Sequence, residues 1–361
     1  MVERLAAKLS AASPSFPHQR FVAEATQGLD ALELMDRGRH IVAALARVLP
    51  ADFEKAARLL LRSLDEPGTP LPGGAMASFF YLPHVLFVAA RGLDHFDTAM
   101  SLQRELTRRF SAEFSIRAYL DHDPGRSFAV LEDWSHDPDP NVRRLVSEGT
   151  RPRLPWAPRL ARYDARRSLS LLENLKDDPS EYVRRSVANH LNDLAKLEPA
   201  LFLGVCTRWA RHAPPERRRL LRHALRWLVK RGHPRALALA GAGHATGVVV
   251  RAVSLPARAR IGGTLRVEVE LTNRSRTQRR LVVDVAVHFV KADGRPRPKV
   301  FKLRVLALHP GQVVRLARTI TLRDLTTRRH YPGAHRIDAL LNGRARRLGA
   351  VELRRASTSM A

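Results

Sequence analysis

Two glutamates near the middle of the chain are the residues best suited to chemistry. Glu113 lies in SAEFSIRAYL beside an aromatic side chain and close to an arginine, and Glu148 lies in NVRRLVSEGTRPRLPW among several arginines and Trp156. A carboxylate in such a setting can stabilise a developing positive charge or deprotonate a water molecule. An isolated glutamate in a helical repeat more often faces solvent or pairs with a neighbouring arginine, so its type alone does not decide its role.

The second stretch breaks the pattern of the helix that contains it. After Glu148 the chain continues with Gly149 and with prolines at 152, 155 and 158, whereas the related segment 182–196, YVRRSVANHLNDLAK, has no such residues. Proline removes a helix hydrogen bond and clashes with the preceding turn. A helix should therefore stop just after Glu148, and local departures of this kind tend to mark functional sites.

An internal repeat positions both stretches. Residues 129–149 and 170–190 overlay at a shift of about 41, and each copy has Asp-Pro followed by Val-Arg-Arg. This period and pattern resemble a HEAT repeat, in which stacked helix pairs leave a continuous concave surface. We expect Asp137 and Asp178 each to pair with one arginine of a Val-Arg-Arg, as a ladder between repeats, while the other arginine faces the groove.

The spacing of apolar residues changes near residue 240. Helical periodicity holds from 1 to 240, and period-two alternation with about seven short strands follows in 247–354, after the linker AGAGHATG. The predicted fold is a mainly α, HEAT-like α-α superhelix followed by an all-β immunoglobulin-like sandwich. Because the cysteine and tryptophan signature of antibody domains is missing, only the architecture is predicted. Residues 355–361 are expected to be a disordered tail.

The charge of the chain indicates a polyanionic partner. Its 361 residues include 62 Lys and Arg against 35 Asp and Glu, a formal net charge of +27, and residues 247–361 account for +18 of it. Such an excess favours nucleic acid or an anionic membrane surface. The basic clusters fall at turns between predicted strands, where loops could contact a phosphate backbone. A genome rich in G·C pairs also inflates arginine content, which leaves a merely solvated basic surface as the alternative.

Several other classes lose support from the sequence. The single cysteine, Cys206, excludes an internal disulfide framework and fits a reducing cytoplasm. With no apolar run long enough to span a bilayer and no secretory leader, we expect a protein of the bacterial cytoplasm or nucleoid without a membrane partner. The histidines lack metal-ligand spacing, and P-loop, dinucleotide and serine-hydrolase motifs are missing, so we expect neither a metal nor a cofactor.

The stretches around both glutamates resemble one known family. VRRLVSEGTRPRLPW, preceded by SAEFSIRAYL and followed by SEYVRRSVANHLNDLAK, is similar to the HEAT-like alkylpurine DNA glycosylases of the AlkC branch of the AlkC/AlkD superfamily. The similarity covers residues 75–235, and part of that branch also carries a β-sandwich after the helices. The resemblance implies a base-excision-repair enzyme that hydrolyses the N-glycosidic bond of alkylated, cationic bases such as 3-methyladenine in double-stranded DNA.

The resemblance also implies roles for individual residues. Glu113 and Glu148 would be the catalytic acidic pair, and Trp156 would form an aromatic wall for the cationic base. Asp193 in NHLND is a third acidic candidate, although it could equally cap or pair within its helix. DNA contacts are expected from Arg144, Arg185, Asn189, Arg151 and Arg153. The two arginines at 151 and 153 lie on the proline-rich loop with no helical partner, which favours them for phosphates.

Two further hypotheses remain beside the enzyme. A non-catalytic HEAT-repeat DNA-binding or scaffold protein would bind DNA without releasing a base, and a protein-interaction solenoid would show little salt dependence of DNA affinity. For the enzyme, residues 111–160 contain no lysine, so the Schiff-base nucleophile of a lyase is missing and a monofunctional glycosylase is expected. A monomer is favoured because a repeat solenoid buries its own faces.

Overall fold

A computed structural model describes residues 1–71, 74–242, 245–325 and 329–355 of the chain. The expected tail therefore lies, except for Arg355, outside the described residues. The helices are α1 (Val2–Ala12), α2 (His18–Thr26), η1 (Leu29–Ala31), α3 (Leu34–Val48), α4 (Phe53–Arg62), η2 (Gly74–Tyr81), α5 (Leu82–Arg91), α6 (Phe96–Thr107), α7 (Ile116–His122), α8 (Pro124–Trp134), α9 (Pro140–Gly149), α10 (Ala165–Leu175), α11 (Glu181–Leu197), α12 (Pro199–Ala210), α13 (Pro215–Ala224), α14 (Arg226–Lys230) and α15 (Pro234–Leu239). The strands are β1 (Val248–Ser254), β2 (Arg258–Arg260), β3 (Thr264–Asn273), β4 (Arg279–Val290), β5 (Pro296–Leu308), β6 (Val313–Thr321), β7 (Gly333–Leu341) and β8 (Arg344–Arg354).

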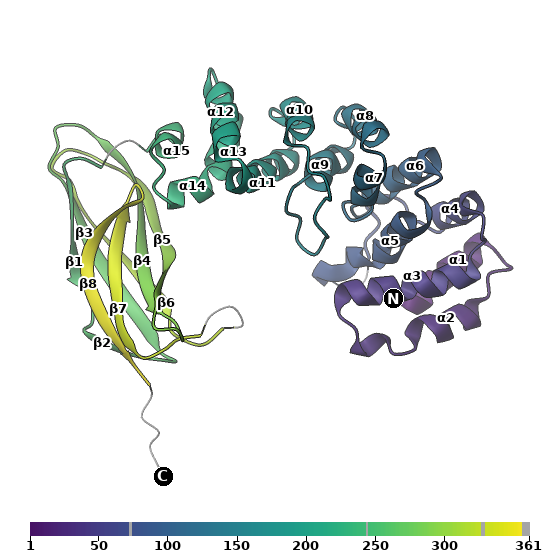
Figure 1. The fold of residues 1–361 in the computed structure, drawn as a ribbon, viewed down its shortest axis with the longest axis horizontal. Helices are drawn as coiled ribbons and strands as arrows, with labels where there is room; N and C mark the ends of the chain where they lie inside the picture. The colour runs from purple at the N-terminus through teal and green to yellow at the C-terminus, as the bar shows by residue number, and fades with distance from the viewer. Residues whose placement is uncertain (72–73, 243–244, 326–328, 356–361) are drawn as a thin grey trace, which may run out of the picture. The chain divides into compact units, whose positions relative to one another are not determined.

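The chain divides into two compact units (Figure 1). The first comprises Met1–Glu198 together with Ala213–Ala224, and the second comprises Pro199–His212 together with the chain from Leu225 onward. The helix α12 and the helices α14 and α15 thus belong with the strands, while α13 belongs with the helical array.

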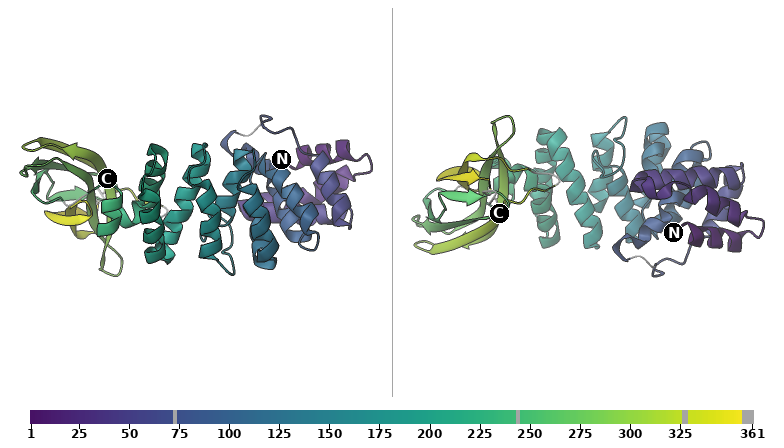
Figure 2. Two further views of the ribbon diagram at one scale, coloured as in Figure 1. Left: turned by 90° about the horizontal axis from the view of Figure 1, so that it is seen from above. Right: turned by 90° about the horizontal axis from the view of Figure 1, so that it is seen from below.

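The repeat copies seen in the sequence are the helix pairs α8–α9 and α10–α11. The helix α9 packs against α8, α10 and α11, and α11 packs in turn against α13, so these helices lie side by side in the first unit (Figure 2). Apolar residues at helical spacing bury the contact faces, as Val142 and Val146 do on α9 and Val183 and Val187 do on α11. Buried faces of this kind join successive repeats into one continuous core.

The expected ladder between repeats is confirmed for Asp178, which pairs with Arg143 of a Val-Arg-Arg, whereas Asp137 pairs with Arg104, which belongs to no Val-Arg-Arg. The Nε of Arg104 donates to Asp137 across 2.6 Å, and the Nε of Arg143 donates to Asp178 across 2.6 Å. Each aspartate also accepts a backbone N–H two residues on, which closes the Asp-Pro turn before the next helix. Arg184 departs from the expectation, because it donates to backbone carbonyls of its own turn, including that of Pro179 at 2.8 Å.

The helix α9 begins and ends where its sequence predicts. The side chain of Asp139 accepts the N–H of Asn141 at 2.8 Å, and proline follows as the first helical residue. The helix stops at Gly149, where an added Cβ would lie 2.6 Å from the side chain of Ile116 on α7. Glycine is needed there because α7 packs directly against the helix end. Figure 1 shows the loop 150–164 leaving this end as a long excursion before α10.

The strands of the second unit form two sheets in the described part of the chain. One has the order β1-β3-β6 and the other β2-β8-β7-β4-β5. Alternate residues of β3, including Leu265, Val267 and Val269, are buried together with inward residues of β4 such as Val285 and Phe289. This period-two burial is that of a β-sandwich with one shared core. Within the described residues, none of the helices is both long and apolar enough to cross a bilayer.

Candidate active site

The end of α9 carries a buried carboxylate whose two oxygens are both occupied. Glu148 is 5% exposed. Its Oε1 forms an ion pair with Arg151, and its Oε2 accepts the hydroxyl of Ser186 on α11 at 2.6 Å. A second arginine, Arg144, lies one turn earlier on α9 with its Nη2 3.7 Å from Oε2. These contacts give both oxygens of the buried carboxylate a hydrogen-bonding or ion-pairing partner.

The second glutamate approaches from the turn that precedes α7. The Oε2 of Glu113 accepts from Ser111 at 3.0 Å and from Nη1 of Arg144 at 3.1 Å. Its Oε1 has no hydrogen-bond partner among the residues that the structure describes. Burial raises the pKa of Glu113 above its ordinary value, and the charge of Glu148 raises it further, while Arg144 opposes both. A raised pKa makes this carboxylate a stronger base near neutral pH.

Arg144 connects the two glutamates. One guanidinium nitrogen contacts Glu113 and another contacts Glu148, while its Cζ lies 5.0 Å from the ring centre of Tyr182 on α11. The planar fork of arginine allows such simultaneous contacts, which the single ammonium group of a lysine could not make. The arrangement joins a carboxylate from the turn before α7 to one at the end of α9.

The third acidic candidate joins the same cluster. Asp193 accepts from Nη2 and Nε of Arg151 at 2.6 and 3.0 Å, and from Lys196 at 2.8 Å. The pairing within its helix that the sequence allowed is present, with Lys196, and the contact with Arg151 adds a partner from outside the helix. The expectation that Arg151 has no helical partner is wrong, because its guanidinium lies between Glu148 on α9 and Asp193 on α11. The chain turns sharply after Gly149 and brings residue 151 back over the gap between these helices.

This cluster occurs in a chain with informative relatives. The family model for "Uncharacterised protein YhaZ, C-terminal Ig-like domain" matches residues 249–355. The uncharacterized protein YhaZ of Bacillus subtilis (strain 168) is 31% identical over 350 residues, which cover 95% of this chain and 94% of YhaZ. The structure of Pseudomonas fluorescens alkylpurine DNA glycosylase AlkC, bound to DNA containing an abasic-site analog, is 39% identical with a TM-score of 0.88 and 98% coverage of each chain. The chain belongs to the AlkC family. The predicted resemblance and the predicted order of helical array and immunoglobulin-like sandwich are thereby confirmed.

In this AlkC-family chain a buried arginine organises the loop after α9. Arg117 on α7 donates to the carbonyls of Gly149, Arg151 and Pro158 at 3.0, 2.7 and 3.0 Å. It is 2% exposed, and burial lowers its pKa to about 10, which leaves it cationic at neutral pH. In the sequence this arginine stands out only as a neighbour of Glu113. A usable signal was its position three residues before Leu120, which is also buried on α7.

Trp156 lies on the loop that Arg117 holds, but outside the acid cluster. The side chain is 70% exposed, whereas Glu148 and Asp193 are buried. Its φ of +61° is in the left-handed region, which tryptophan rarely adopts. Such backbone strain persists only where surrounding contacts impose it, and it is common at functional sites. The carbonyl contacts of Arg117 on both sides of Trp156 supply that constraint.

The remaining predicted DNA-contacting residues of this AlkC-family chain divide into exposed and paired side chains. Arg153 is exposed on the loop, and Arg185 is exposed on α11 next to Ser186. The amide of Asn189 lies 3.1 Å from Nε2 of His223 on α13. Arg144 and Arg151, by contrast, are occupied by carboxylates. Among the described residues, no group of three or more His, Cys, Asp or Glu is placed to hold a metal ion.

A buried histidine, His190, contacts the backbone of the residue that precedes Glu148. The Nδ1 of His190 lies 2.9 Å from the carbonyl of Ser147, and its Nε2 lies 3.0 Å from the hydroxyl of Tyr163 on the loop. Burial lowers the pKa of His190 to about 4, so the ring is neutral. The carbonyl can only accept, so Nδ1 carries the proton and Tyr163 donates to Nε2. The sequence contained no pattern that joined His190 to Tyr163.

Proposed function

We propose that this chain is a monofunctional DNA glycosylase that excises alkylated, cationic purines such as 3-methyladenine from double-stranded DNA. The observation that carries the proposal is the pair of glutamates bridged by Arg144 at the interrupted end of α9. The pair lies in a chain that matches AlkC, named as an alkylpurine DNA glycosylase and solved with abasic-site DNA, over 98% of its length.

The chemistry suits these residues. Alkylation at N3 or N7 gives the base a positive charge, so the bond from C1′ to nitrogen breaks with its electron pair leaving on a neutral base. The sugar then develops oxocarbenium character, and water adds to C1′ while its proton passes to a base. The leaving group needs no protonation. The protein must therefore supply negative charge near C1′ and a positioned water molecule.

We assign the electrostatic part to Glu148. Its oxygens are held by Arg151 and Ser186, which fixes the position of the carboxylate. A carboxylate about 4 Å from a developing cation contributes about 4 kcal/mol at an effective dielectric constant of about 20. That energy corresponds to about a thousandfold in rate. Asp193 contributes indirectly by holding Arg151 in place.

We assign the water to Glu113. Its open Oε1 and its raised pKa are the properties of a general base, whereas Oε2 is fixed by Ser111 and Arg144. The proton released by water would reside on Oε1. Trp156 would contact the cationic base from the loop, with a cation–π attraction of about 0.5–2 kcal/mol.

The proposed partner is the backbone of double-stranded DNA. Arg153, Arg185 and Asn189 would contact its phosphates, and so would the basic turns of the sandwich, while Arg144 and Arg151 act inside the acid cluster. We also propose a monomer that acts in the bacterial cytoplasm or nucleoid, because the substrate is chromosomal DNA. Contacts between basic loops and phosphates do not depend on base sequence. They therefore suit an enzyme that must find damage at any sequence.

Release of free base from duplex DNA treated with a methylating agent tests the proposal. We expect 3-methyladenine from the wild-type chain and at least a tenfold slower release from Glu113→Gln and from Glu148→Gln, with DNA binding retained. Glu54→Gln is the matched control, because Glu54 is an exposed glutamate on α4 and pairs with Arg58 at 3.8 Å. Its release rate should equal that of the wild type.

The scaffold hypothesis makes the opposite prediction. A DNA-binding HEAT protein without catalysis would bind the duplex with a steep salt dependence and release no base. In that case Glu148→Gln would leave its behaviour unchanged. The wild-type measurement alone separates the two functions.

Lyase activity would require a free amine at the site. Residues 111–160 contain no lysine, but the structure brings Lys196 to the edge of the acid cluster. Its Nζ forms an ion pair with Asp193 at 2.8 Å. An ion-paired ammonium is a poor nucleophile. We expect the product strand to remain intact at its abasic site, with no covalent adduct trapped by borohydride. A trapped adduct lost in Lys196→Arg would contradict the monofunctional assignment.

A further inference from the structure

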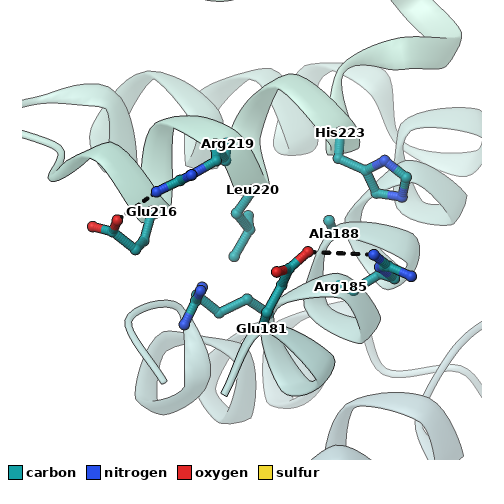
Figure 3. Close-up of a pocket in the computed structure, with 8 residues that line it drawn as sticks. Glu181, Arg185, Ala188, Glu216, Arg219, Leu220 and His223 are labelled. Carbon is teal, nitrogen blue, oxygen red and sulfur yellow. Dashed lines mark hydrogen bonds and ion pairs between the residues drawn. The ribbon is translucent and has the colours of Figure 1, made fainter. Parts of the chain in front are cut away.

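A polar groove lies one repeat beyond the acid cluster, between α11 and α13 in the first unit. Its volume is about 390 Å³, and its charged lining includes Arg184, Arg185 and Arg219 together with Glu181 and Glu216. Figure 3 shows Glu181 and Arg185 reaching it from α11, and Glu216, Arg219 and His223 from α13. We call this feature the α11–α13 groove.

The α11–α13 groove occupies the place in its repeat that the acid cluster occupies in the preceding one. The shift of 41 residues places Arg185 at the position of Arg144 and Asn189 at the position of Glu148. The buried carboxylate of one repeat is thus a neutral amide in the next. Asn189 contacts His223 at 3.1 Å and leaves no negative charge at that position. A site suited to a cation in one repeat therefore becomes a site suited to an anion in the next.

Arg185 and Arg219 of the groove each pair with an exposed glutamate. Arg185 pairs with Glu181 at 3.3 Å, with 67% and 76% of the two side chains exposed. Arg219 pairs with Glu216 at 2.7 Å, with 67% and 43% exposed. Exposed ion pairs between neighbouring turns of one helix are weak. Both guanidinium groups can exchange a glutamate for a phosphate, to which arginine binds with two parallel hydrogen bonds.

Resting on the proposed function, we propose that the α11–α13 groove binds one backbone phosphate of the DNA strand beside the damaged nucleotide, through Arg185 and Arg219. Packed helices lie about 8–10 Å apart, and a DNA strand rises about 3.4 Å per nucleotide. The acid cluster on one side of α11 and the groove on the other would therefore contact positions of the strand within about three nucleotides of each other. Arg184 is held by the carbonyl of Pro179 and adds positive potential without a direct contact.

The first test compares DNA binding by Arg185→Gln and Arg219→Gln with that of matched controls. The probe is a duplex of about 20 base pairs with a central abasic-site analogue. We expect each groove variant to bind about tenfold more weakly and to lower the salt slope by about one. The controls Arg58→Gln and Arg39→Gln remove exposed arginines that pair with Glu54 and Asp36 at the same helical spacings. They should bind as the wild type does.

The glutamates of the groove provide a test that misfolding cannot imitate. Because Glu181 and Glu216 compete with the phosphate for the two arginines, Glu181→Gln and Glu216→Gln should bind the duplex more tightly than the wild type. A damaged fold would weaken binding instead. Equal effects of the groove and control arginines, or weaker binding by both glutamine variants, would overturn the proposal.

Single neutral methylphosphonate substitutions then locate the phosphate. One substitution within about three nucleotides of the lesion should weaken binding by the wild type and have no further effect on Arg185→Gln. If no position distinguishes the two proteins, the groove is not a phosphate site. Base release by the wild type separates the two proposals. Excision with no groove effect would refute only the groove, and a groove effect without excision would refute only the glycosylase.

Discussion

The helix pairs α8–α9 and α10–α11 share a sequence phrase and differ in the residues that come after it. The helix α9 stops after 10 residues, whereas α11 continues for 17. Before Val-Arg-Arg the two copies have equivalent turns, in which Asp137 or Asp178 accepts a backbone N–H two residues on. The divergence after that point sends residues 150–164 across the array and places Arg151 against both helices. The repeats thus position the helices, and the early end of α9 allows the loop after it to complete the acid cluster.

The two copies also differ in the surroundings of equivalent arginines. The side chain of Arg144 is 19% exposed and contacts two carboxylates, whereas that of Arg185 is 67% exposed and pairs with one exposed glutamate. Burial makes the first arrangement costly to disturb and the second one easy to exchange. The same residue type therefore holds acids in one repeat and is available to a ligand in the next.

The largest expected effect tests this difference in burial. Arg151→Met would leave Glu148 and Asp193 buried without their shared partner, so the free energy of unfolding should fall by about 3–5 kcal/mol. Arg185→Met removes an exposed arginine and should change it by less than about 0.5 kcal/mol. Urea unfolding followed by circular dichroism measures both. Similar losses in the two variants would show that the acid cluster is no more constrained than the groove.

A second prediction concerns a variant in which position 148 carries asparagine, the residue found at the equivalent position 189 of the next repeat. Glu148→Asn places the amide of position 189 at the equivalent point of α9 and removes the charge assigned to the oxocarbenium-like sugar. Base release under single-turnover conditions should slow about a hundredfold or more. Binding to a duplex with an abasic-site analogue should persist. A variant with the release rate of the wild type would remove Glu148 from the mechanism.

A third prediction addresses the loop that distinguishes the two copies. A lysine at position 117 has one compact ammonium group and cannot span the carbonyls of residues 149, 151 and 158. Arg117→Lys should lower the free energy of unfolding by about 1–3 kcal/mol and increase proteolysis within 150–164. Arg126→Lys is the matched control, since Arg126 is 53% exposed on α8. Equal proteolysis of the two variants would argue against this role of Arg117.

The smallest expected effect separates the two regions by pH. Base release needs ionised Glu113, so its rate should fall as pH falls through the raised pKa of that group. The arginines of the groove keep their charge, so DNA binding should not weaken over the same range.

The pH dependence of the free energy of unfolding has the opposite sign to that of the release rate. The gain from neutral Glu113 is fully present below its unfolded-state pKa and is lost as pH rises through its folded-state pKa. Glu113→Gln should remove both dependences, and an unchanged rate profile in that variant would assign the titration to another group.

Much of this arrangement could be read from the chain itself. The Asp-Pro and Val-Arg-Arg phrase predicted the ladder that Arg143 and Asp178 form, because both belong to a local pattern repeated at one period. The prolines after Glu148 predicted the helix end because proline stops a helix through its own local geometry. The contacts of Arg117 and the pairing of His190 with Tyr163 were not predictable, because each joins segments that no sequence pattern relates.

The sequence by itself determined the helical array, the change to strands, the excess of positive charge and the acidic candidates. Local periodicity, turn chemistry and composition are properties of short stretches, so they need no partner to be recognised. Only the tertiary structure decided which candidates meet. It brought Glu113, Glu148 and Asp193 into one cluster through Arg144 and Arg151 and left the side chain of Trp156 outside. The reason is physical, since a buried charge is tolerated only where packing of distant segments supplies its partners.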